Sequence, residues 1–573
     1  MANEIMEGGQ AIIRCLESEG VEYIFGYSGG AAIPIFDALV TTNTKIKFIL
    51  VRHEQGAAHM ADGYARATGK PAVVLVTSGP GATNTLTGIM TAHMDSVPMI
   101  VLTGQSVSWM LGKDAFQEAD IFGITMPVVK HSYMVKDPND IPRIVREAFH
   151  VSTTGRPGPV LIDIPKDISG GPCTADLHAE MDLPGYRLDF SVDNDIIHEI
   201  AEALSKAERP LILAGHGAMI SGADNILKTL AEKAQIPVTT TLLGKGVFPE
   251  THELALGMLG MHGTAYANKA VCECDLLLNI GSRFDDRILG QPAEFCKNAT
   301  IIHIDIDATE IGKMIQPQIA CVADAKTALE ELIKHVPVLE TAVWRKHLDG
   351  YKAKYPLKFK RQGGLKMQHI IDEFYKLTDG KACVATDVGQ HQMWAAQFYL
   401  NDSRYNWLSS GGAGTMGVGL PYCIGAAFGR PNDVNVCFVG DGGFQMTFFE
   451  LATAALHKLP IKIVVLNNHY LGMVRQWQEL FYEDRTSGVD LEGNPDFVKL
   501  AESFGIKGFN LRRPGDVKRV LQSALDYNEG PCLINCEVEK TDNVFPMIPA
   551  GAPIEHMLIE PPNRKLEKPT GST

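Results

Sequence analysis

The chain has 573 residues, which is enough for about three to four domains of ordinary size. Its formal net charge of −15 argues against a nucleic-acid or membrane-surface partner, and its hydrophobic fraction of 45% indicates globular structure throughout. No uninterrupted apolar run is long enough to cross a membrane, and the start, MANEIMEGGQ, lacks the basic and apolar regions of a secretory signal. Eleven scattered cysteines fit a reducing compartment, so we expect a cytoplasmic protein.

The first block, residues 1–185, alternates short apolar strands with helical stretches. We predict strands at Ile46–Val51, Ala72–Thr77, Met99–Leu102 and Val160–Ile164, and helices at Gln55–Ala67 and Ala82–His93. Such alternation is typical of a parallel sheet with helices on both faces. A polar stretch that contains Gly and Pro, Gly171–Ser191, is then expected to be a linker.

Two further blocks have the same character. The second, residues 194–338, contains predicted strands at Pro210–Ala214, Leu276–Ile280 and Ile301–Ile304. A connector rich in Lys and Tyr, Trp344–Gly364, leads to the third block, residues 365–540. The tail, residues 541–573, ends in KLEKPTGST, which we expect to be poorly ordered. The predicted fold class is α/β, with three doubly wound parallel-sheet domains.

The third block contains the stretch that says most about chemistry, GDGGFQMTFFELATAALHKLPIKIVVLNN, which begins at Gly440. The apolar run Val434–Val439 just before it predicts a buried strand. Within it, Phe448–Leu459 has apolar residues at helical spacing, and Ile461–Leu466 predicts a second buried strand. Parallel strands that are neighbours bring their carboxyl ends together, and open α/β sheets bind ligands at that edge.

Asp441 and the pair Asn467–Asn468 follow these two strands, so one carboxylate and one amide oxygen converge. Hard cations such as magnesium take oxygen ligands and leave room for phosphate and water. Gly440, Gly442 and Gly443 let the backbone turn tightly and approach a phosphate. A lone GDG is as well explained by an ordinary strand–turn–helix. The double Asn at this spacing favours a magnesium–diphosphate site instead.

Together, the GDG and double-Asn segments resemble the motif of thiamine-diphosphate enzymes. Glu54, in VRHEQGAAHMADGYARATG, follows a predicted strand and begins a helix, where a carboxylate can also serve simply as a dipole partner. In the resembled enzymes, the activating glutamate follows such a strand in the amino-terminal domain. It hydrogen-bonds the aminopyrimidine N1′ and favours the tautomer that generates the ylid. The resemblance implies this role for Glu54.

The resemblance narrows to one family and covers nearly the whole chain. The motifs are GYSGGAAIPIFDAL, RHEQGAAHMADGYARATG, TSGPGATN, DAFQEAD, RPGPVLIDIPKD, LGMLGMHG, GSRFDDR, GQHQMWAAQ, GGAGTMGVGLP and GMVRQWQELFYEDR. Each is weak alone, but together they resemble the large catalytic subunit of acetohydroxyacid (acetolactate) synthase. That enzyme decarboxylates pyruvate on thiamine diphosphate and condenses the two-carbon unit with pyruvate or 2-ketobutyrate. This is the first common step of branched-chain amino-acid biosynthesis.

The resemblance implies roles for individual residues. The Mg²⁺ ligands are Asp441, Asn468 and the main-chain carbonyl of Tyr470. The residues implied to bind thiamine diphosphate are Gly29, Gly389, Gln390, His391, Met416, Gly442, Gly443 and Met473, with Met416 propping the cofactor in a bent conformation. The substrate funnel is lined, from the partner subunit, by Gly29, Gly30, Phe116, Gln117 and Lys166, of which Gln117 and Lys166 join Glu54 among the catalytic residues.

Two residues are implied to select the second substrate. Arg287, the last residue of RFDDR, pairs with the carboxylate of the acceptor, because a guanidinium matches a carboxylate bidentately. The alternative for Arg287 is a surface ion pair with Asp285 or Asp286. Trp477 is implied to favour 2-ketobutyrate over pyruvate by packing on the extra methyl group, and its alternative is a core tryptophan.

The middle block raises the question of a flavin. Gly215-His-Gly217 follows a predicted strand and suits a phosphate turn, although a short Gly-x-Gly is a weak signal. By resemblance, the FAD-binding positions are Arg156, Gly215, Gly217, Met261, His262, Arg283, Asp305 and Asp324. Because the reaction has no net redox change, we expect FAD to be structural.

Three alternative functions account for part of the sequence. A flavin-linked pyruvate oxidase-type enzyme shares the three-domain plan and both cofactors, but RFDDR and Trp477 speak against it. Glyoxylate carboligase lacks the activating glutamate that this chain has as Glu54. A catalytically silent paralogue, serving as a regulatory or scaffold subunit, would have lost Glu54, Asp441 or Asn468, and all three are present.

Three positions depart from the family pattern. Ser28 replaces the usual proline of a GYPGG turn, and we expect it to loosen that loop by about 0.4–1 kcal/mol. Gly443 stands where serine or alanine is common and is expected to loosen the magnesium turn. Ala323 replaces the glycine before Asp324 and puts one FAD contact in doubt.

The expected assembly follows from the two halves of the site. Glu54 and Asp441 belong to different blocks, so they must meet across an interface. In the resembled superfamily one subunit holds the pyrimidine and its partner holds the diphosphate. The expected minimal active unit is therefore a homodimer, alone or as a dimer of dimers. The lack of an ACT-like regulatory segment fits control by a separate small regulatory subunit.

Overall fold

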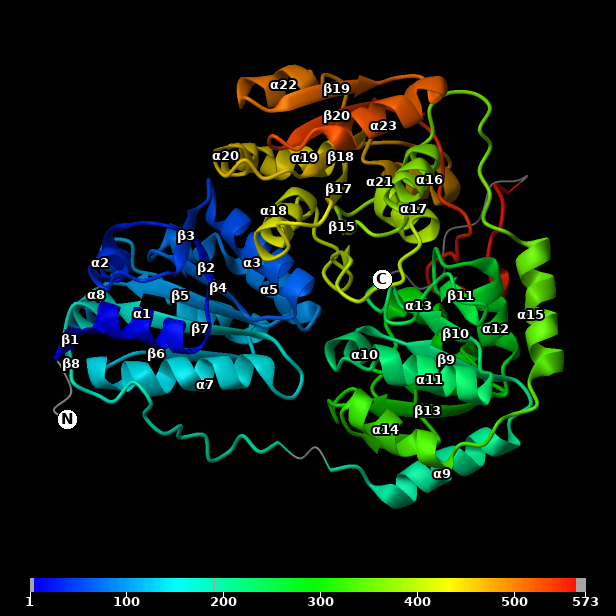
Figure 1. The fold of residues 1–573 in the computed structure, drawn as a ribbon, viewed down its shortest axis with the longest axis horizontal. Helices are drawn as coiled ribbons and strands as arrows, with labels where there is room; N and C mark the ends of the chain where they lie inside the picture. The colour runs from blue at the N-terminus through cyan, green and yellow to red at the C-terminus, as the bar shows by residue number, and fades with distance from the viewer. Residues whose placement is uncertain (1–4, 189–190, 563–573) are drawn as a thin grey trace.

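The structure is a computed structural model that describes residues 5–188 and 191–562. The segment KLEKPTGST, predicted to be poorly ordered, lies outside the described residues. Three domains are seen in Figure 1: an N-terminal domain in blue, a central domain in green, and a C-terminal domain in yellow to orange. They meet near the middle of the molecule, and residues 174–188 run in extended form along its lower edge.

Each domain is built on a six-stranded parallel sheet. In spatial order, the N-terminal sheet is β3 (Lys47–Leu50), β2 (Tyr23–Tyr27), β4 (Ala72–Val76), β5 (Met99–Gln105), β7 (Pro159–Pro165) and β6 (His131–Met134). The central sheet is β11 (Ala255–Met258), β10 (Val238–Thr240), β9 (Pro210–Ala214), β12 (Leu276–Ile280), β13 (Thr300–Asp305) and β14 (Ile319–Val322). The C-terminal sheet is β16 (Trp407–Leu408), β15 (Cys383–Thr386), β17 (Asn435–Gly440), β18 (Lys462–Asn467), β20 (Cys532–Glu537) and β19 (Lys507–Leu511).

The strand order relates two of these domains. When the strands of each sheet are numbered from its own first strand, the N-terminal and C-terminal sheets have the same order, 2-1-3-4-6-5. The central sheet has the order 3-2-1-4-5-6, which is the order of dinucleotide-binding folds. The predicted fold class is therefore confirmed, and the shared order of the outer domains is a relationship that their sequences do not show.

Helices cover both faces of the sheets. Those of the N-terminal domain include α1 (Gly8–Ser18), α2 (Ile33–Thr41), α3 (Glu54–Thr68), α5 (Leu86–Met94) and α7 (Ile141–Thr153). The central domain carries α9 (Asn194–Lys206), α11 (Asp224–Ala234), α12 (Ala265–Glu273) and α14 (Ala325–His335). The C-terminal domain carries α16 (Met367–Thr378), α17 (Gln390–Phe398), α18 (Gly419–Gly429), α21 (Gly472–Phe481), α22 (Phe497–Ser503) and α23 (Val517–Asp526).

Two local predictions need correction. The predicted helix Phe448–Leu459 is instead the end of a broken helical stretch, in which α19 (Asp441–Thr447) is followed by a 3-10 turn and by α20 (Leu451–Leu456). Leu459 is buried after the helix has ended, because Lys458 turns the chain at φ +48°. The predicted connector Trp344–Gly364 contains helix α15 (Ala342–Lys354), whose Trp344 Nε1 donates to the Pro210 carbonyl at 3.1 Å.

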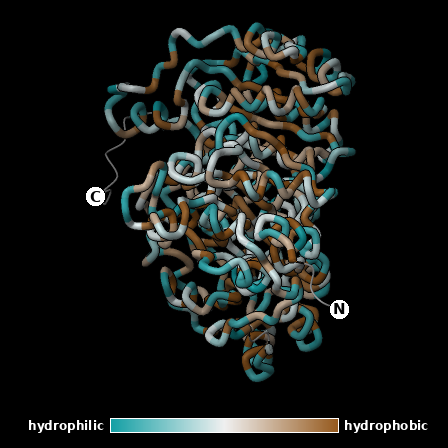
Figure 2. The backbone as a smooth tube through the Cα atoms, turned by 90° about the vertical axis from the view of Figure 1, so that its left-hand side faces the viewer, coloured by the Kyte–Doolittle hydropathy of each residue, from teal (hydrophilic) through white to brown (hydrophobic). Residues whose placement is uncertain are grey.

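The N-terminal and C-terminal domains pack through α3 and α18. A Cβ at Gly63 or at Gly425 would collide with main chain of the facing helix, so glycine at both positions allows the close crossing. One core of buried apolar residues, which includes Phe25 and Phe444, continues across this contact. Figure 2 shows hydrophobic segments running through the interior and hydrophilic segments concentrated on outer loops. The two domains therefore form a rigid frame around the site.

Candidate active site and its cofactor pockets

Nearly all candidate residues lie in segments that follow the carboxyl end of a strand. The C-terminal set follows β15, β16, β17 and β18, the N-terminal set follows β2, β3, β5 and β7, and the central set follows or ends β9, β11, β12, β13 and β14. Arg156, which precedes β7, is the exception. Parallel α/β sheets place their ligands at this edge, so the topology by itself gathers the candidates into three groups.

In the C-terminal group, Asp441 is the first residue of α19 and only 1% exposed. Its Oδ2 accepts a hydrogen bond of 2.7 Å from Asn494 Nδ2, whereas Oδ1 has no partner among the described residues. Burial raises the pKa of Asp441 to about 6. A buried carboxylate oxygen that lacks a donor is the feature that a cation would satisfy.

The double Asn lies beside this oxygen. Asn494 Nδ2 also contacts Asn467 Oδ1 at 3.2 Å and so ties the ends of β17 and β18 together. Asn468 Oδ1 accepts the main-chain N–H of Tyr470 at 3.1 Å, and Tyr470 forms an isolated antiparallel bridge with Asp490. Within residues 5–188 and 191–562, no group of three or more His, Cys, Asp or Glu could hold a metal. The candidate site thus has one carboxylate and otherwise neutral oxygens.

The start of α17 faces the same turn. The His391 ring lies against both Gly389 and Gly440, where an added Cβ would be 3.0 Å and 3.1 Å from its atoms. Burial lowers the pKa of His391 to about 4, and its Nε2 has no partner within the described part of the chain. Gln390 Nε2 donates to Gln476 Oε1 at 2.9 Å and to a main-chain carbonyl at 2.8 Å. Gln390 Nε2 is therefore committed to protein acceptors, whereas Gln390 Oε1 and His391 Nε2 have no partner among the described residues and can meet a ligand.

A buried carboxylate, Asp387, fixes the backbone at the carboxyl edge of the C-terminal sheet. It accepts the main-chain N–H groups of Val388 at 2.9 Å, Gly417 at 3.0 Å and Gly419 at 2.9 Å, and burial raises its pKa to about 6. A Cβ at Gly443 would collide with the Asp387 carboxylate. Glycine at position 443 therefore gives Asp387 room, which qualifies the expectation that it only loosens the turn.

The N-terminal group gathers around Glu54. A Cβ at Gly81 would lie 3.5 Å from Glu54 Oε1 and 2.7 Å from Thr77 Cγ2, and one at Gly29 would lie 2.5 Å from the same Thr77 atom. Glu54 Oε2 accepts a hydrogen bond of 2.9 Å from Asn84 Nδ2. The glycines thus leave the space above Thr77 and Glu54 open.

Three exposed residues complete this group: Phe116, Gln117 and Lys166. All three are exposed, and Phe116 is 88% exposed. Gln117 has φ +57°, a conformation that few residues other than glycine adopt. Further exposed apolar side chains of the N-terminal domain are Ile33, Trp109, Ile124 and Met126. Exposed apolar surface of this kind is typical of sites that contact another molecule.

Glu450, which the sequence analysis missed, holds the turn before Glu54. Its Oε1 accepts the main-chain N–H groups of Arg52 at 3.0 Å and His53 at 3.2 Å, although it belongs to the C-terminal domain. Glu450 is fully buried, and Thr453 Oγ1 donates to its other oxygen at 2.6 Å. The domain that contains Asp441 therefore also positions Glu54 of its own chain.

A cavity of about 810 Å³ opens where the three domains meet. It is lined by most of the central candidates together with residues of the C-terminal group: Arg156, Gly217, Met261, His262, Arg283, Arg287, Asp305, Asp324, Gly389, Met416, Met473 and Trp477. The lining contains neither Glu54, Gln117 and Lys166 nor Asp441, Asn468 and Tyr470. The cavity thus joins the expected flavin and acceptor residues to three of the implied thiamine-diphosphate residues, Gly389, Met416 and Met473, whereas the implied Mg²⁺ ligands and the Glu54 group lie outside its lining.

Two polar residues of this cavity, Arg156 and Asp324, have defined partners. Arg156 reaches from the N-terminal domain to Asp307 at 3.1 Å and Glu310 at 2.7 Å in the central domain. Asp324 caps helix α14 by accepting the Thr327 N–H at 3.0 Å. Gly215 does not line the cavity: an added Cβ there would lie 2.7 Å from Ser282, so this glycine serves close packing.

Met261 and His262 are joined to the end of the described chain. His262 Nδ1 donates to the Pro546 carbonyl at 3.1 Å, and the Ile548 N–H donates to the Met261 carbonyl at 2.9 Å. His262 Nε2 has no partner among the residues described, and burial lowers the pKa of His262 to about 4. The first part of the predicted tail is therefore packed into the site, where Met547 joins the cluster around Trp477.

Arg287 and Trp477 both line the cavity. Arg287 is 60% exposed at its side chain and has only a loose contact of 3.7 Å with Asp286, which at such exposure contributes little. Asp285 pairs instead with Arg283. Trp477 is half-buried, with its ring centroid 5.3 Å from that of Phe481. The guanidinium of Arg287 therefore remains available to a carboxylate ligand.

Three family models match the chain. They are "Thiamine pyrophosphate enzyme, N-terminal TPP binding domain" over residues 6–124, the corresponding "central domain" over residues 197–332, and the "C-terminal TPP binding domain" over residues 387–536. The chain is 48% identical over 576 residues to the acetolactate synthase large subunit of Pyropia yezoensis, with 97% of this chain and 96% of the relative covered. The chain belongs to the acetolactate synthase large-subunit family.

Two bacterial acetolactate synthase large subunits show the same similarity. The Lactococcus lactis protein is 46% identical, with 96% of each chain covered, and the Haemophilus influenzae protein is 44% identical, with 98% of this chain and 99% of the relative covered. The predicted family and the predicted thiamine-dependent enzyme class are confirmed. Among the helices of residues 5–188 and 191–562, none combines the length and hydropathy that a membrane span needs.

Proposed function

We propose that the chain decarboxylates pyruvate and joins the two-carbon unit to a second pyruvate or to 2-ketobutyrate. Thiamine diphosphate, when bound, supplies the nucleophilic carbon and the electron sink for this chemistry. The observation that carries the proposal is the buried, unpartnered Oδ1 of Asp441 beside the double Asn, within a chain of this family. Asp441, Asn468 and the Tyr470 carbonyl would hold Mg²⁺, and His391 would meet the diphosphate.

The chain's own groups have distinct tasks in this reaction. Glu54 would hold a proton toward the pyrimidine ring, with Asn84 fixing its other oxygen. Met416 and Met473 would support the cofactor from the cavity side. Arg287 would orient the acceptor through its carboxylate, and Trp477 would pack on the acceptor's alkyl group. Both line the same cavity, which favours a carboligase over the oxidase alternative.

We place FAD in the 810 Å³ cavity. The lining suits it, because Arg156 and Arg283 offer N–H groups to phosphate or flavin oxygens, and the neutral His262, which donates through Nδ1, presents its unpartnered Nε2 as an acceptor for a flavin N–H or ribityl hydroxyl. The central sheet also has the strand order of dinucleotide-binding folds. Purified protein is expected to be yellow, with a flavin absorption band that disappears when the cofactor is removed.

The active unit would be a homodimer, alone or as a dimer of dimers. Gln117, Lys166 and Phe116 are exposed at the edge that holds Glu54, so a second copy can bring its Asp441 there. All eleven cysteines are free, in keeping with a cytoplasmic protein. Because relatives are named large subunits, a small regulatory subunit is a further proposed partner.

The test is an acetolactate assay on purified protein with thiamine diphosphate, Mg²⁺ and FAD supplied together or omitted singly. Acetolactate should appear with all three and fall sharply without thiamine diphosphate or Mg²⁺. If no acetolactate forms with all three present, the proposed function is wrong. Acetate formation that depends on oxygen or a quinone would revive the oxidase alternative.

A further inference from the structure

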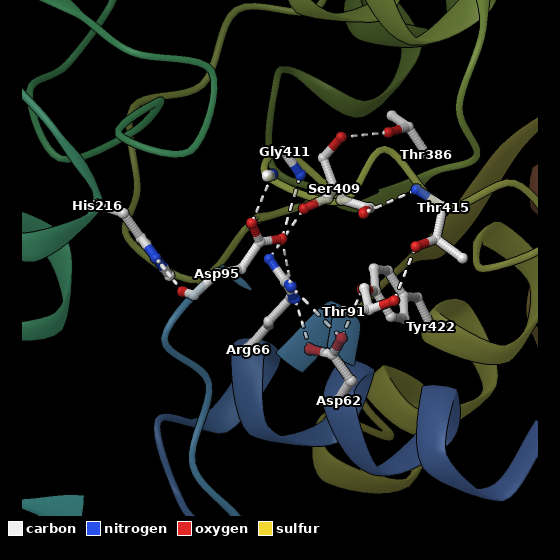
Figure 3. A network of polar contacts seen from close by, with 12 residues as sticks. Asp62, Arg66, Thr91, Asp95, His216, Thr386, Ser409, Gly411, Thr415 and Tyr422 are labelled. Carbon is white, nitrogen blue, oxygen red and sulfur yellow. Dashed lines mark hydrogen bonds and ion pairs between the residues drawn. The ribbon is translucent and has the colours of Figure 1, made fainter. Parts of the chain in front are cut away.

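Asp95 lies where the three domains meet and has no role in the function proposed above. It follows helix α5 of the N-terminal domain and is only 2% exposed, yet it borders the cavity. Figure 3 shows the polar network around it, with side chains drawn from all three domains. Such a position lets one carboxylate touch several elements that are far apart in the sequence.

The Asp95 carboxylate holds the loop that leads to Met416. Its Oδ1 accepts the main-chain N–H of Gly412 at 2.7 Å, and its Oδ2 accepts that of Gly411 at 3.1 Å. Further along the same loop, Thr415 Oγ1 lies 2.7 Å from Thr91 Oγ1, on α5 (Figure 3). Helix α5 and the residue after it therefore fix the loop on both sides of its glycine-rich bend.

A buried arginine fixes Asp95 in turn. Arg66 NH2 donates to Asp95 Oδ2 at 2.8 Å, NH1 donates to the Ser409 carbonyl at 2.8 Å, and Nε donates to Asp62 Oδ1 at 2.6 Å. Tyr422 OH donates to the other Asp62 oxygen at 2.6 Å. Every oxygen of the two carboxylates thus has a donor, and a fully paired buried network of this kind is rigid.

The opposite side of Asp95 faces the cavity. His216 Nδ1 lies 2.8 Å from the Asp95 carbonyl. Burial, together with the Arg66 charge, lowers the pKa of His216 to about 4, so the neutral ring donates through Nδ1–H. The next residue, Ser96, has φ +60° and accepts a hydrogen bond of 2.9 Å from Arg156 Nε. His216 and Arg156 both line the cavity, so the Asp95–Ser96 turn is part of its wall.

We propose that Asp95 is a positioning residue that ties the Met416 loop to the wall of the flavin cavity. A ligand that fixes His216 and Arg156 also fixes the Asp95–Ser96 turn and, through it, the loop that supports the thiamine cofactor. This inference rests on the proposed function, because it needs FAD in the cavity and thiamine diphosphate beside Met416. By linkage, each cofactor then tightens the binding of the other by the same factor.

The test is a binding cycle on the purified full-length protein. Calorimetric titration gives the affinity for thiamine diphosphate with Mg²⁺, in flavin-loaded and flavin-free protein, for the wild type and Asp95→Asn. We expect FAD to tighten this binding by about 5- to 150-fold in the wild type and by about 2-fold or less in the variant. Asparagine keeps the size of Asp95 but turns its NH₂ group either toward the Gly412 N–H or toward Arg66 and the Gly411 N–H, all of which are donors themselves.

Glu147→Gln is the matched control. It also removes the charge of a buried carboxylate of the N-terminal domain, but Glu147 accepts from Arg143 at 3.1 Å and from the Asp182 N–H at 2.8 Å, and touches neither the Met416 loop nor the cavity lining. This variant should keep the wild-type coupling. If Asp95→Asn does not fold, Gly412→Ala tests the same contact from the loop, because the new Cβ would lie 3.0 Å from Asp95 Oδ1 and should likewise reduce the coupling.

Each outcome decides the inference. Wild-type coupling in Asp95→Asn, or in Gly412→Ala where that variant replaces it, overturns it. So do equal thiamine diphosphate affinities in flavin-loaded and flavin-free wild type, which leave the proposed function standing. A wild type that binds no FAD contradicts the flavin part of the proposed function, and the inference falls with it.

Discussion

The N-terminal and C-terminal sheets have the same strand order, yet the residues at their carboxyl edges differ in burial and polarity. The C-terminal edge is closed and polar: Asp441 and both asparagines are buried there. The N-terminal edge is open, with Glu54 half-buried and Phe116 almost fully exposed. The strand order therefore determines at which edge of each sheet a ligand binds. The residues after each strand determine whether that edge binds the pyrimidine half or the diphosphate half of the cofactor.

The supports beneath the two edges differ as well. Asp387, under the C-terminal edge, accepts three main-chain N–H groups and so fixes the backbone itself. Asp163, under the N-terminal edge, accepts hydrogen bonds from two side chains, Thr103 at 2.6 Å and Gln105 at 3.0 Å. Gln105 Nε2 also donates to the Ala119 carbonyl, in the loop that carries Gln117, and so connects Asp163 to that loop. The cofactor's anionic end would thus meet the stiffer edge.

The largest effects should come from the residues that define the two edges. Glu54→Gln should lower kcat by about 10²- to 10⁴-fold and keep cofactor binding, because only proton transfer is lost. Asp441→Asn should instead lose Mg²⁺-dependent binding of thiamine diphosphate, because the site's carboxylate is gone. Steady-state kinetics and cofactor titration separate the two. If both variants weakened thiamine diphosphate binding equally, the two edges would not bind different halves of the cofactor.

A smaller effect is expected at Trp477, on α21 beside the C-terminal edge. Trp477→Leu should lower the preference for 2-ketobutyrate over pyruvate by about 10- to 200-fold, since contact with one extra methyl group is lost. Acetolactate formation should persist. Product ratios with both acceptors present measure this, and Phe481→Leu, a neighbour in the same cluster, serves as control. Unchanged ratios in Trp477→Leu would assign selectivity elsewhere.

Glu450 tests the link between the edges within one chain. Glu450→Ala leaves the Arg52 and His53 N–H groups without an acceptor, which should cost about 1–3 kcal/mol of unfolding free energy and displace Glu54. Glu450→Gln keeps the accepting oxygen, and the Thr453 hydroxyl can then accept from its amide, so it should stay near the wild type. Thermal unfolding and kcat are measured together. An alanine variant with unchanged kcat would show that Glu54 needs no such support.

The smallest expected effect concerns Asp163, whose burial should make the free energy of unfolding depend on pH. Burial raises the pKa of Asp163 from 3.8 to about 7, so the folded protein binds this proton more tightly than the unfolded chain. The free energy of unfolding therefore falls as pH rises from about 4 to 7. Asp163→Asn has no such charge, so its stability relative to the wild type should rise by about 1.4 kcal/mol per pH unit in that window. Unfolding midpoints of both proteins across pH 5–8 check this, and a constant difference would refute it.

Buried strands were the part of the fold that the sequence predicted best. The expected strands Val434–Val439 and Ile461–Leu466 differ by one residue at each end from β17 and β18. Runs of β-branched and aromatic residues bounded by turns leave few other structures for such segments. The candidate residues were found for the same reason, because the GDG, Glu54 and RFDDR segments each follow closely on a strand, β17, β3 and β12 respectively.

Contacts between distant segments could not be predicted. Helix α19 begins at Asp441 with glycines instead of an apolar stripe, so periodicity placed the helix too late. Asp95, Arg66 and Glu450 act through partners more than 300 residues away, such as Ser409 for Arg66 and Arg52 for Glu450. The one local signal was the pair Asp62 and Arg66 at helical spacing, which alone reads as an ordinary surface ion pair.

The central claim is that Glu54 of one chain works with Asp441 of another. Glu54→Gln and Asp441→Asn proteins, each nearly inactive, can be unfolded and refolded together or co-expressed. A mixed dimer would then contain one intact site, so an equal mixture should recover about a quarter of the wild-type activity. If both residues served a site within one chain, every site in the mixed dimer would carry a defect. A mixture of confirmed heterodimers that stays as inactive as its parents would contradict the account.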